Sequence, residues 1–339
     1  MSELLKVENL HVTFHTYAGE VKAVRGVSFS LDKGEVLAIV GESGCGKTVT
    51  SKAIMRLLDR TSGEIDKESV IELFGKNMVT LPKRELNKIR GKEISMIFQD
   101  SMTSLNPTMT IGKQIMENIL VHEKVGKREA KKRALELLKL VEIPNAEERL
   151  NNYPHQMSGG MRQRAMIAVA LACNPKVLIA DEPTTALDVT IQAQLMDLLK
   201  NIQKKTEMAV ILVTHDLGVV ANFADRVQVM YAVAVMERGS VHDIFKAPRH
   251  PYTCALLSSM PGRIQESKSE LYALRGTPPD LRRPIKGCPF AERCEYRMSI
   301  CLKKTPEEFP AGEGHSAACW LCHSMAPKVE PLKGIGGEG

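Results

Sequence analysis

Aromatic residues are scarce in this chain of 339 residues, since one Trp, six Tyr and eight Phe make up only 4% of it. So few rings argue against a stacking surface for single-stranded nucleic acid. No apolar run is longer than the nine residues from Ala165 to Cys173, which is about half of what a membrane span requires. The opening sequence, MSELLKVENLHVTF, lacks the basic stretch and apolar core of a secretory signal. The sequence therefore predicts an intracellular protein with no nucleic-acid partner.

Charge and cysteine content bear on the partners of the protein and on the state of its thiols. Lys and Arg number 46 against 40 Asp and Glu, and the formal charge of +6 is spread along the chain, so it indicates no particular partner. Eight cysteines are too few for a disulfide scaffold, although five of them lie within residues 288–322. In an intracellular protein such a cluster indicates reduced or metal-bound thiols.

Short apolar runs alternate with helical patterns over the first 245 residues. Strands are expected at 36–40, 93–98, 177–181 and 209–215, and a charged helical stretch at about 110–150. This alternation predicts an α/β fold with a mainly parallel core sheet. Prolines become frequent after residue 246 and predict a loop-rich second domain, and the glycine-rich end predicts a disordered tail.

A glycine-rich sequence, GESGCGKT, follows the first of these strands at Gly41–Thr48. It matches the P-loop pattern G-x-x-x-x-G-K-[ST] between a strand and a helix. Glycines let backbone N–H groups close around phosphate oxygens, and the helix N-terminus adds partial positive charge. Lys47 is expected to reach the β- and γ-phosphates, and the Thr48 hydroxyl to bind Mg²⁺.

Two acidic residues end the third expected strand, in VLIADEP. Asp181 is expected at the mouth of the sheet, where its carboxylate can hold the hydration shell of Mg²⁺. Glu182 is placed to act as general base for the attacking water. Either residue alone would also fit a plain strand end, but together with a P-loop they predict a nucleotide hydrolysis site.

The order of the remaining motifs resembles that of ABC ATPases. MSGGMRQR at residues 157–164 is similar to the signature motif of that family, and Gln99 in IFQD to its Q-loop glutamine. Asp188 in ALD is similar to the D-loop aspartate, and His215 in VTHD to the switch histidine. Tyr17 resembles the aromatic residue that stacks on adenine, with a surface-loop aromatic as the alternative.

The resemblance implies the composition of the site. Glu182, His215 and Gln99 are implied as catalytic residues, and Thr48, Gln99 and Asp181 as Mg²⁺ ligands. The residues implied to contact ATP are Tyr17, Gly41, Ser43, Gly44, Cys45, Gly46, Lys47, Thr48, Val49, Ser158, Gly159, Gly160 and Asp188.

The resemblance also implies partners and a location. ABC ATPase subunits pair head to tail, so each nucleotide is expected between Lys47 of one subunit and Ser158 of the other. Two membrane-spanning permease subunits and a second related ATPase are expected, as a heterodimer or, alternatively, a homodimer. An extracellular peptide-binding protein is an indirect partner, and the chain is expected on the cytoplasmic face of the membrane.

The C-terminal motifs resemble one branch of the family. HPYT, RGTPPDL and GCPFAERC look like motifs of the oligopeptide and dipeptide importer ATPases, whose relatives include nickel importers. Four cysteines resemble the pattern seen in that branch: Cys288, Cys294, Cys301 and Cys319. Their irregular spacing suits a [4Fe–4S] cluster, with Zn²⁺ or no metal as alternatives. Cys322 could replace Cys319 as a ligand, and His315 is either a substitute ligand or a solvated loop residue.

The sequence thus predicts a P-loop NTPase of the ABC type. An ATPase domain is expected over residues 1–245, with a helical subdomain at about 100–170. A C-terminal domain with a four-cysteine metal site is expected over 246–325, and a disordered tail over 326–339. The implied function is ATP-driven uptake of dipeptides or oligopeptides; nickel import and a soluble, non-transport ABC ATPase are the alternatives.

Overall fold

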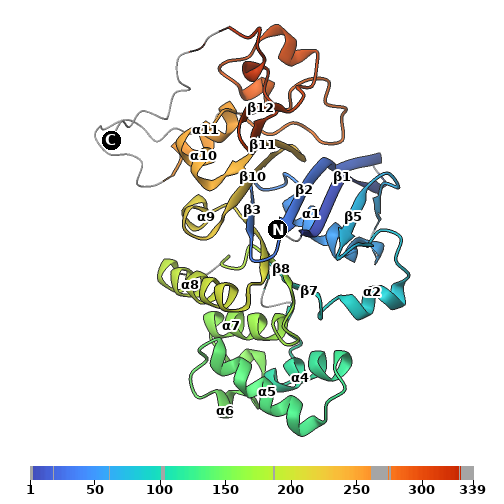
Figure 1. Cartoon of the computed structure of the whole chain (residues 1–339), viewed down its shortest axis with the longest axis vertical. Helices are drawn as coiled ribbons and strands as arrows, with labels where there is room; N and C mark the ends of the chain where they lie inside the picture. The colour runs from blue at the N-terminus through green and yellow to red at the C-terminus, as the bar shows by residue number, and fades with distance from the viewer. Residues whose placement is uncertain are drawn as a thin grey trace. The chain divides into compact units, whose positions relative to one another are not determined.

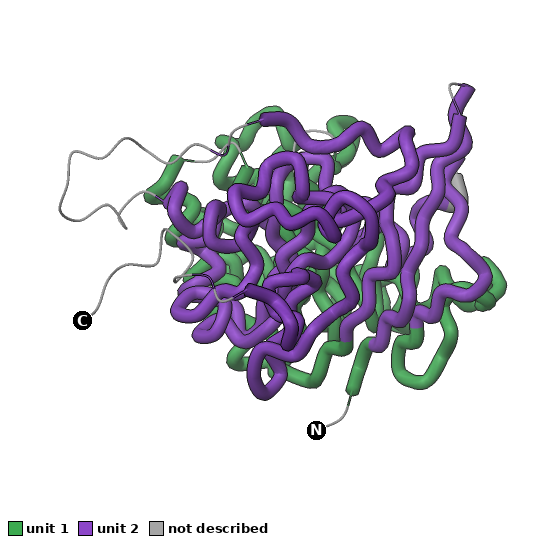
Figure 2. Tube along the Cα trace, turned by 90° about the horizontal axis from the view of Figure 1, so that it is seen from above, with its two compact units in different colours: residues 1–5, 30–36, 72–213 green, residues 6–29, 37–71, 214–339 purple. Residues whose placement is uncertain are grey.

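The computed structural model in Figure 1 describes residues 3–17, 19–60, 62–100, 104–185, 188–260, 274, 276–327 and 329. The chain forms two compact units, coloured in Figure 2, and each draws on segments that are distant in sequence. Unit 1 comprises residues 1–5, 30–36 and 72–213, and unit 2 comprises 6–29, 37–71 and 214–339. The predicted domain boundaries at 245 and 325 stay a prediction, and residues 328 and 330–339 of the predicted tail lie outside the described residues.

Three parallel strands form the centre of unit 1. β8 (Val177–Asp181) pairs with β7 (Ile94–Ile97) on one side and β9 (Ala209–Thr214) on the other. Every residue of these strands is buried, as expected for apolar, Val- and Ile-rich strands of a parallel sheet. Their carboxyl ends meet at one edge, which places Asp181 there.

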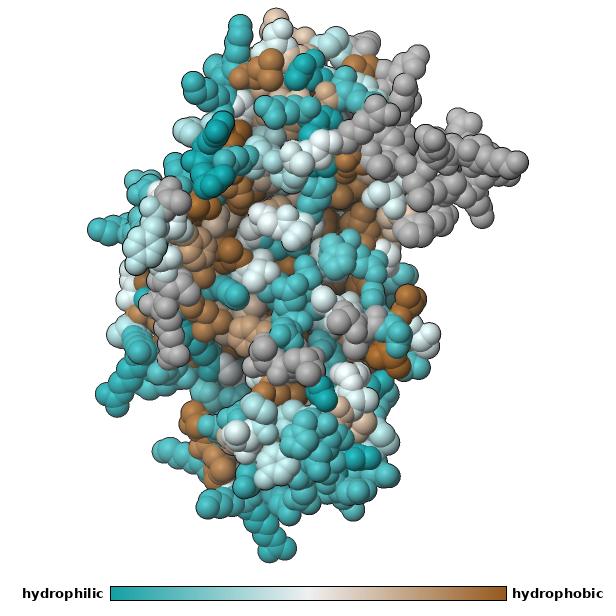
Figure 3. All heavy atoms as spheres, turned by 180° about the vertical axis from the view of Figure 1, so that it is seen from behind, coloured by the Kyte–Doolittle hydropathy of each residue, from teal (hydrophilic) through white to brown (hydrophobic). Residues whose placement is uncertain are grey.

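Helices make up most of the rest of unit 1. Their bounds are α2 Lys83–Ile89, α4 Ile111–His122, α5 Lys127–Leu140, α6 Ala146–Arg149, α7 Gly159–Ala170 and α8 Val189–Thr206, with a 3₁₀ turn at Pro154–Gln156. α5 buries Ala130, Ala134, Leu137 and Leu138 at helical spacing. Its lysines and arginines face outward and contribute to the hydrophilic surface at the lower end of Figure 3.

Unit 2 contains most of the antiparallel strands. β1 (Glu3–Thr16) lies beside β2 (Gly19–Asp32) and pairs antiparallel with β4 (Gly63–Ile65). β3 (Val36–Val40) pairs parallel with β10 (Arg226–Tyr231), which pairs antiparallel with β11 (Ala234–Ser240). β13 (His315–Ala317) adds to β11, and β12 (Phe309–Gly312) to β13. In unit 1, the last two residues of β5 (Val70–Leu73) pair antiparallel with β6 (Lys76–Asn77) in a short hairpin. The strands of the chain therefore pair in both senses, since β3 pairs parallel with β10 and β8 pairs parallel with β7 and β9.

Most helices of unit 2 contribute residues to an apolar cluster. Their bounds are α1 Lys47–Ile54, α9 Leu217–Phe223, α10 Val241–Lys246 and α11 Pro251–Ser258, with 3₁₀ turns at Leu57–Arg60, Ala291–Arg293, Ser299–Leu302 and Trp320–Cys322. Tyr231 of β10, Tyr252 of α11 and Phe290 meet in this cluster, with ring centroids 4.6–5.4 Å apart. The C-terminal region is thus packed onto the strands that flank the P-loop.

None of the helices in the described ranges combines the length and the hydropathy that crossing a bilayer requires.

Candidate nucleotide-binding site

The P-loop connects β3 to α1 in unit 2, in the strand–loop–helix setting that the sequence predicts. Gly41, Gly44 and Gly46 have φ angles of 150°, 79° and 98°, which disfavour residues with a side chain. A Cβ atom on Gly41 would lie 2.1 Å from the Met230 carbonyl oxygen, and one on Gly46 would lie 2.6 Å from that of Ala23. The loop therefore presents bare backbone, as an N–H cradle for phosphate requires.

Lys47 is buried, with 5% of its surface exposed, at the first position of α1. Its ammonium donates to the carbonyl oxygens of Gly41, at 2.7 Å, and Glu42, at 3.0 Å. These bonds hold the Lys47 ammonium over the loop and the helix N-terminus. From there it can donate to phosphate oxygens instead of the two carbonyl oxygens. The backbone cradle and this cation fit the triphosphate of ATP.

The other predicted P-loop residues divide by exposure. Ser43 and Gly44 are exposed on the loop, whereas Thr48 and Val49 are half-buried in the first turn of α1. Cys45 is buried, and burial raises the pKa of its thiol. A protonated, enclosed thiol is a space-filling residue here rather than a reactive one.

The structure brings Glu182 and Gln99 together within unit 1. Glu182 follows β8 with a φ of 47°, and its backbone N–H donates to Val213 at 2.8 Å. Its carboxylate accepts hydrogen bonds from the Gln99 side-chain amide, at 2.8 Å, and from the Thr185 hydroxyl, at 3.0 Å. Asp181, one residue earlier, is 1% exposed at the end of β8. A left-handed glutamate held by side-chain donors is a strained and oriented group, as is common at reactive sites.

The signature motif lies at the start of another helix of unit 1. Ser158 is the N-cap of α7, and its exposed hydroxyl accepts from the Met161 N–H at 3.3 Å. Gly159 and Gly160 begin α7 and have no side chains to cover their own backbone N–H groups. Asp188 is the N-cap residue of α8 and is exposed. Ser158 and Asp188 thus lie at different helix starts.

Tyr17 and His215 belong to unit 2 and are both exposed. Tyr17 is in the turn between β1 and β2, with a fully exposed ring. His215 follows β9 directly and precedes Asp216, whose carboxylate caps α9 by accepting from the N–H groups of Gly218 and Val219. Both rings are accessible to a ligand.

The sequence reasoning missed the residues that hold the P-loop from the C-terminal side. Arg293 makes a two-pronged ion pair with Glu42, and the Tyr252 hydroxyl accepts from the Glu42 N–H at 3.0 Å. Hydrogen bonds to the Glu42 carboxylate raise the pKa of Arg293, and burial raises that of Tyr252. Both residues stand in motifs that identify the branch, HPYT and GCPFAERC, but nothing local in those motifs points to Glu42.

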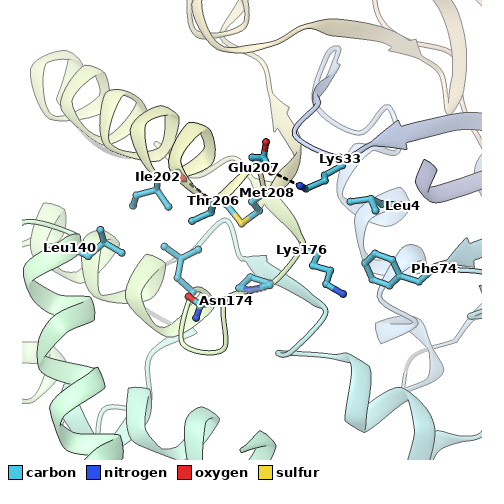
Figure 4. Close-up of a pocket in the computed structure, with 12 residues that line it drawn as sticks. Leu4, Lys33, Phe74, Leu140, Asn174, Lys176, Ile202, Thr206, Glu207 and Met208 are labelled. Atoms are coloured by element: carbon cyan, nitrogen blue, oxygen red, sulfur yellow. Dashed lines mark hydrogen bonds and ion pairs between the residues drawn. The ribbon is translucent and has the colours of Figure 1, made fainter. Parts of the chain in front are cut away.

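A cavity of about 440 Å³ in unit 1 lies away from Asp181 and Glu182. It is lined by residues of α5 and α8 and by the segments that precede β8 and β9, as Figure 4 shows. Lys33 and Glu207 form an ion pair at its margin, and the Lys176 ammonium lies 5.0 Å from the centre of the Phe74 ring. Because Asp181 is at the carboxyl ends of these strands and the cavity at their amino ends, the cavity is not the nucleotide site.

Comparison with known families matches most of the chain. A family model described as ABC transporter matches residues 24–185, and one described as oligopeptide/dipeptide transporter, C-terminal region, matches residues 236–301. The oligopeptide transport ATP-binding protein OppD of Bacillus subtilis is 56% identical over 99% of this chain and 93% of its own length. This chain belongs to the ATP-binding subunits of ABC transporters, in the oligopeptide/dipeptide branch. The dipeptide transport ATP-binding protein DppD of the same organism is 55% identical over 95% of each chain.

Solved structures of ABC transporter cassettes have the same fold as this ABC ATPase. A dimeric bacterial ABC transporter cassette, MJ0796, is 30% identical over 70% of this chain and 99% of its own, with a TM-score of 0.62. The same cassette bound to ADP and Pi in a post-hydrolysis state gives a TM-score of 0.63. The predicted family, the ABC cassette fold and the ATPase class are confirmed.

The predicted iron–sulfur cluster is wrong, whereas the C-terminal domain and its cysteine ligands stay a prediction. Within the described residues, no three or more His, Cys, Asp or Glu side chains form a group that could hold a metal ion. Two of these cysteines, Cys288 and Cys294, are half-buried and pack against the apolar cluster of unit 2. Burial raises the pKa of Cys288 to about 12 and that of Cys294 to about 11. The families and relatives matched above are described by ATP binding and transport.

His315 is neither a metal ligand nor a solvated loop residue. It lies in β13 with 4% of its surface exposed, and its Nε2 atom is 2.7 Å from the Glu237 carboxylate of β11. Cys322, the alternative fourth ligand, is half-buried in the last 3₁₀ turn.

Proposed function

We propose that this ABC ATPase binds and hydrolyses ATP to power the uptake of dipeptides or oligopeptides through separate membrane subunits. The observation that carries the proposal is the P-loop, where Gly41 and Gly46 leave no room for side chains and Lys47 already lies over the backbone cradle. The high identity to OppD and DppD supports peptides as the transported class. None of the relatives named above favours nickel import or a soluble, non-transport ATPase.

The P-loop residues supply the phosphate contacts in this proposal. Backbone N–H groups between Gly41 and Thr48 bind the phosphate oxygens, and Lys47 moves from the Gly41 and Glu42 carbonyls to the β- and γ-phosphates. The loop residues Ser43 and Gly44 and the first-turn residue Val49 line the same cradle, and the Tyr17 ring stacks on adenine. Thr48, Asp181 and Gln99 provide hydroxyl, carboxylate and amide oxygens, a donor set that suits Mg²⁺. When bound, Mg²⁺ neutralises charge on the phosphates.

Glu182 acts as the general base. Its carboxylate accepts a proton from water as the water oxygen attacks the γ-phosphorus, which yields ADP and phosphate. The hydrogen bonds from Gln99 and Thr185 orient that carboxylate. His215 contacts the γ-phosphate or the attacking water.

The proposal also includes the assembly. Ser158, Gly159 and Gly160 present an uncovered helix N-terminus to the nucleotide of a paired ATPase subunit, and Asp188 lies at the same contact. The pair is a heterodimer with a related ATPase or, alternatively, a homodimer. It docks on two membrane-spanning permease subunits at the cytoplasmic face, with an extracellular peptide-binding protein delivering substrate.

Replacing Glu182 by Gln tests this function. In the transporter reconstituted in vesicles, we expect Glu182→Gln to retain MgATP binding and to lose ATP turnover by about 10²–10⁴-fold, because the amide cannot accept the proton. Uptake of a labelled peptide should stop with it. The readouts are phosphate release and peptide accumulation in the presence of MgATP.

Glu207→Gln is the matched control, since Glu207 also has a left-handed backbone, with a φ of 51° against 47° for Glu182, and also lies in unit 1. It should transport at the wild-type rate. Full turnover by Glu182→Gln would contradict the catalytic assignment. If vesicles with the wild-type transporter take up Ni²⁺ but no peptide, the transported substrate is Ni²⁺ and not a peptide.

A further inference from the structure

Glu42, the second residue of the P-loop, is held by a side chain that lies 251 residues away in sequence. Arg293 Nη1 donates to Glu42 Oε2 at 2.8 Å, and Arg293 Nη2 donates to Glu42 Oε1 at 3.0 Å. The Arg293 side chain is 6% exposed and that of Glu42 is 25% exposed. A bidentate guanidinium–carboxylate pair with so little solvent access is stronger and more directional than a surface ion pair.

The backbone of Glu42 is fixed as well. Its N–H donates to the Tyr252 hydroxyl at 3.0 Å, and its carbonyl accepts from the Lys47 ammonium at 3.0 Å. One residue thus connects α11 and the 3₁₀ turn at 291–293 to the lysine of the P-loop. Any displacement of Glu42 would move a carbonyl that positions Lys47.

The groups that hold Glu42 are themselves supported. Arg293 also donates to the Tyr231 hydroxyl at 3.2 Å, and its guanidinium carbon lies 5.5 Å from the centre of the Tyr231 ring. Tyr231, Tyr252 and Phe290 belong to the apolar cluster of unit 2. The guanidinium is therefore oriented by a packed aromatic wall, which reduces the rotamer freedom it would lose on pairing.

The charge of Glu42 explains why such a contact matters. A carboxylate in a loop that binds a polyanion repels that ligand unless a cation neutralises it, and partial burial strengthens the repulsion. Arg293 is permanently charged, so it cancels the Glu42 charge at every physiological pH. Without Arg293, the phosphate site would retain an uncompensated negative charge.

We infer that Arg293 is a positioning residue for nucleotide binding, which holds the P-loop through Glu42 and cancels its charge. The C-terminal region of this branch thereby takes part in the ATP site. The inference rests on the proposed function only in that the P-loop binds ATP, and it adds a contact that the P-loop motif does not contain.

Arg293→Met in the full-length chain provides the test, with the Kd of MgATP and the KM and kcat of its hydrolysis as readouts. We expect affinity to fall about tenfold, which corresponds to 1.4 kcal/mol, while kcat changes less than KM. Arg293→Lys should restore part of the affinity. The loss of MgATP affinity relative to the wild type should be smaller at 0.5 M salt than at 0.05 M salt, because screening weakens the repulsion between Glu42 and the phosphates. A purely structural defect would not depend on salt in this way.

Two further variants separate charge from folding. Glu42→Gln combined with Arg293→Met removes the unpaired carboxylate, so it should recover most of the lost affinity. Glu42→Gln alone keeps one acceptor oxygen for Arg293 and leaves no unpaired carboxylate, so its affinity for MgATP should fall by less than tenfold, which keeps the inference testable if Arg293→Met fails to fold. Arg238→Met, which breaks a different ion pair in unit 2, with Glu308, should lower the melting temperature and leave affinity unchanged.

The outcomes are distinct. Wild-type affinity in Arg293→Met, a double variant as weak as Arg293→Met, or a tenfold loss in Glu42→Gln alone would each overturn the inference. A wild-type chain that binds no MgATP would instead contradict the proposed function itself.

Discussion

His250 is a buried, neutral base at the start of α11. It is 1% exposed, and its Nδ1 atom accepts from the Tyr252 N–H at 3.0 Å to cap the helix. Its Nε2 atom has no hydrogen-bond partner within the described residues. Burial lowers the pKa of His250 to about 4, although the Glu237 carboxylate, which also pairs with His315, opposes that shift. The folded protein therefore resists protonation of this ring.

We predict that acid destabilises the protein through His250. The unfolded chain takes up a proton near pH 6.5, whereas the folded chain stays neutral until about pH 4, so this contribution to stability is complete above pH 6.5 and falls as the pH drops. Between pH 7.5 and pH 5 the free energy of unfolding should fall by about 2 kcal/mol from this group. Denaturant titrations at the two pH values measure it.

His250→Asn isolates that effect, because its side-chain oxygen can keep the helix cap without titrating. Its loss of stability between the same pH values should be smaller by about 2 kcal/mol. An equal loss in both proteins would assign the acid sensitivity to other groups.

At the scale of elements, the turn between β10 and β11 carries backbone strain. Tyr231 pairs with Ala234 across a two-residue connection formed by Ala232 and Val233, whose φ angles are 44° and 65°. Such a turn requires left-handed backbone at both positions, where glycine or asparagine is usual. The Arg25 N–H donates to the Val233 carbonyl at 2.8 Å and helps to hold the turn beside the P-loop strand β3.

Ala232→Gly should stabilise the protein by about 0.5–1 kcal/mol, because glycine adopts this backbone without the Cβ clash. The matched control is Ala234→Gly, two residues on in β11, which should destabilise because its backbone is extended and gains nothing from glycine. Thermal unfolding of the two variants compares them directly. A lower melting temperature for Ala232→Gly would show that the turn is not strained.

At the scale of the whole molecule, nucleotide binding should raise stability. A ligand at 100 times its Kd that binds only the folded state stabilises it by about 2.7 kcal/mol, so MgATP should raise the melting temperature by several degrees. Lys47→Ala should lose most of this rise, because the phosphates lose their principal cation. Differential scanning fluorimetry with and without MgATP measures the shift.

Lys33→Ala is the control for that experiment, since Lys33 pairs with Glu207 at the cavity of unit 1 and not with the P-loop. The Lys33→Ala variant should show the same rise in melting temperature with MgATP as the wild type. A Lys47→Ala chain with a wild-type shift would show that MgATP binds elsewhere.

Local signals predicted the buried strands and the backbone of the P-loop. The runs VLAIV and VLIAD form buried strands because they are almost entirely apolar, and glycine occupies the left-handed positions of the P-loop because a side chain is strained there. Each of these features depends on neighbours within a few residues. That is why composition and order were sufficient to expect them.

The prediction of an iron–sulfur cluster was wrong because it depends on contacts between residues that are distant in the chain. Spacing along the chain gives the number of thiols in a segment but not their surroundings. Cys288 and Cys294 pack against the apolar cluster of unit 2, a contact that no local pattern encodes. His315 likewise joins Glu237 because β13 pairs with β11, a contact between strands 78 residues apart.

The sequence by itself determined the ATPase chemistry of this protein, because the P-loop and the signature motif that identify the family consist of residues that are adjacent in the chain. Only the tertiary structure decided what holds that chemistry in place. The Glu182–Gln99 contact spans 83 residues, and the Glu42–Arg293 pair spans 251. Such pairs are set by how strands and helices pack around an apolar cluster, and no local pattern encodes them.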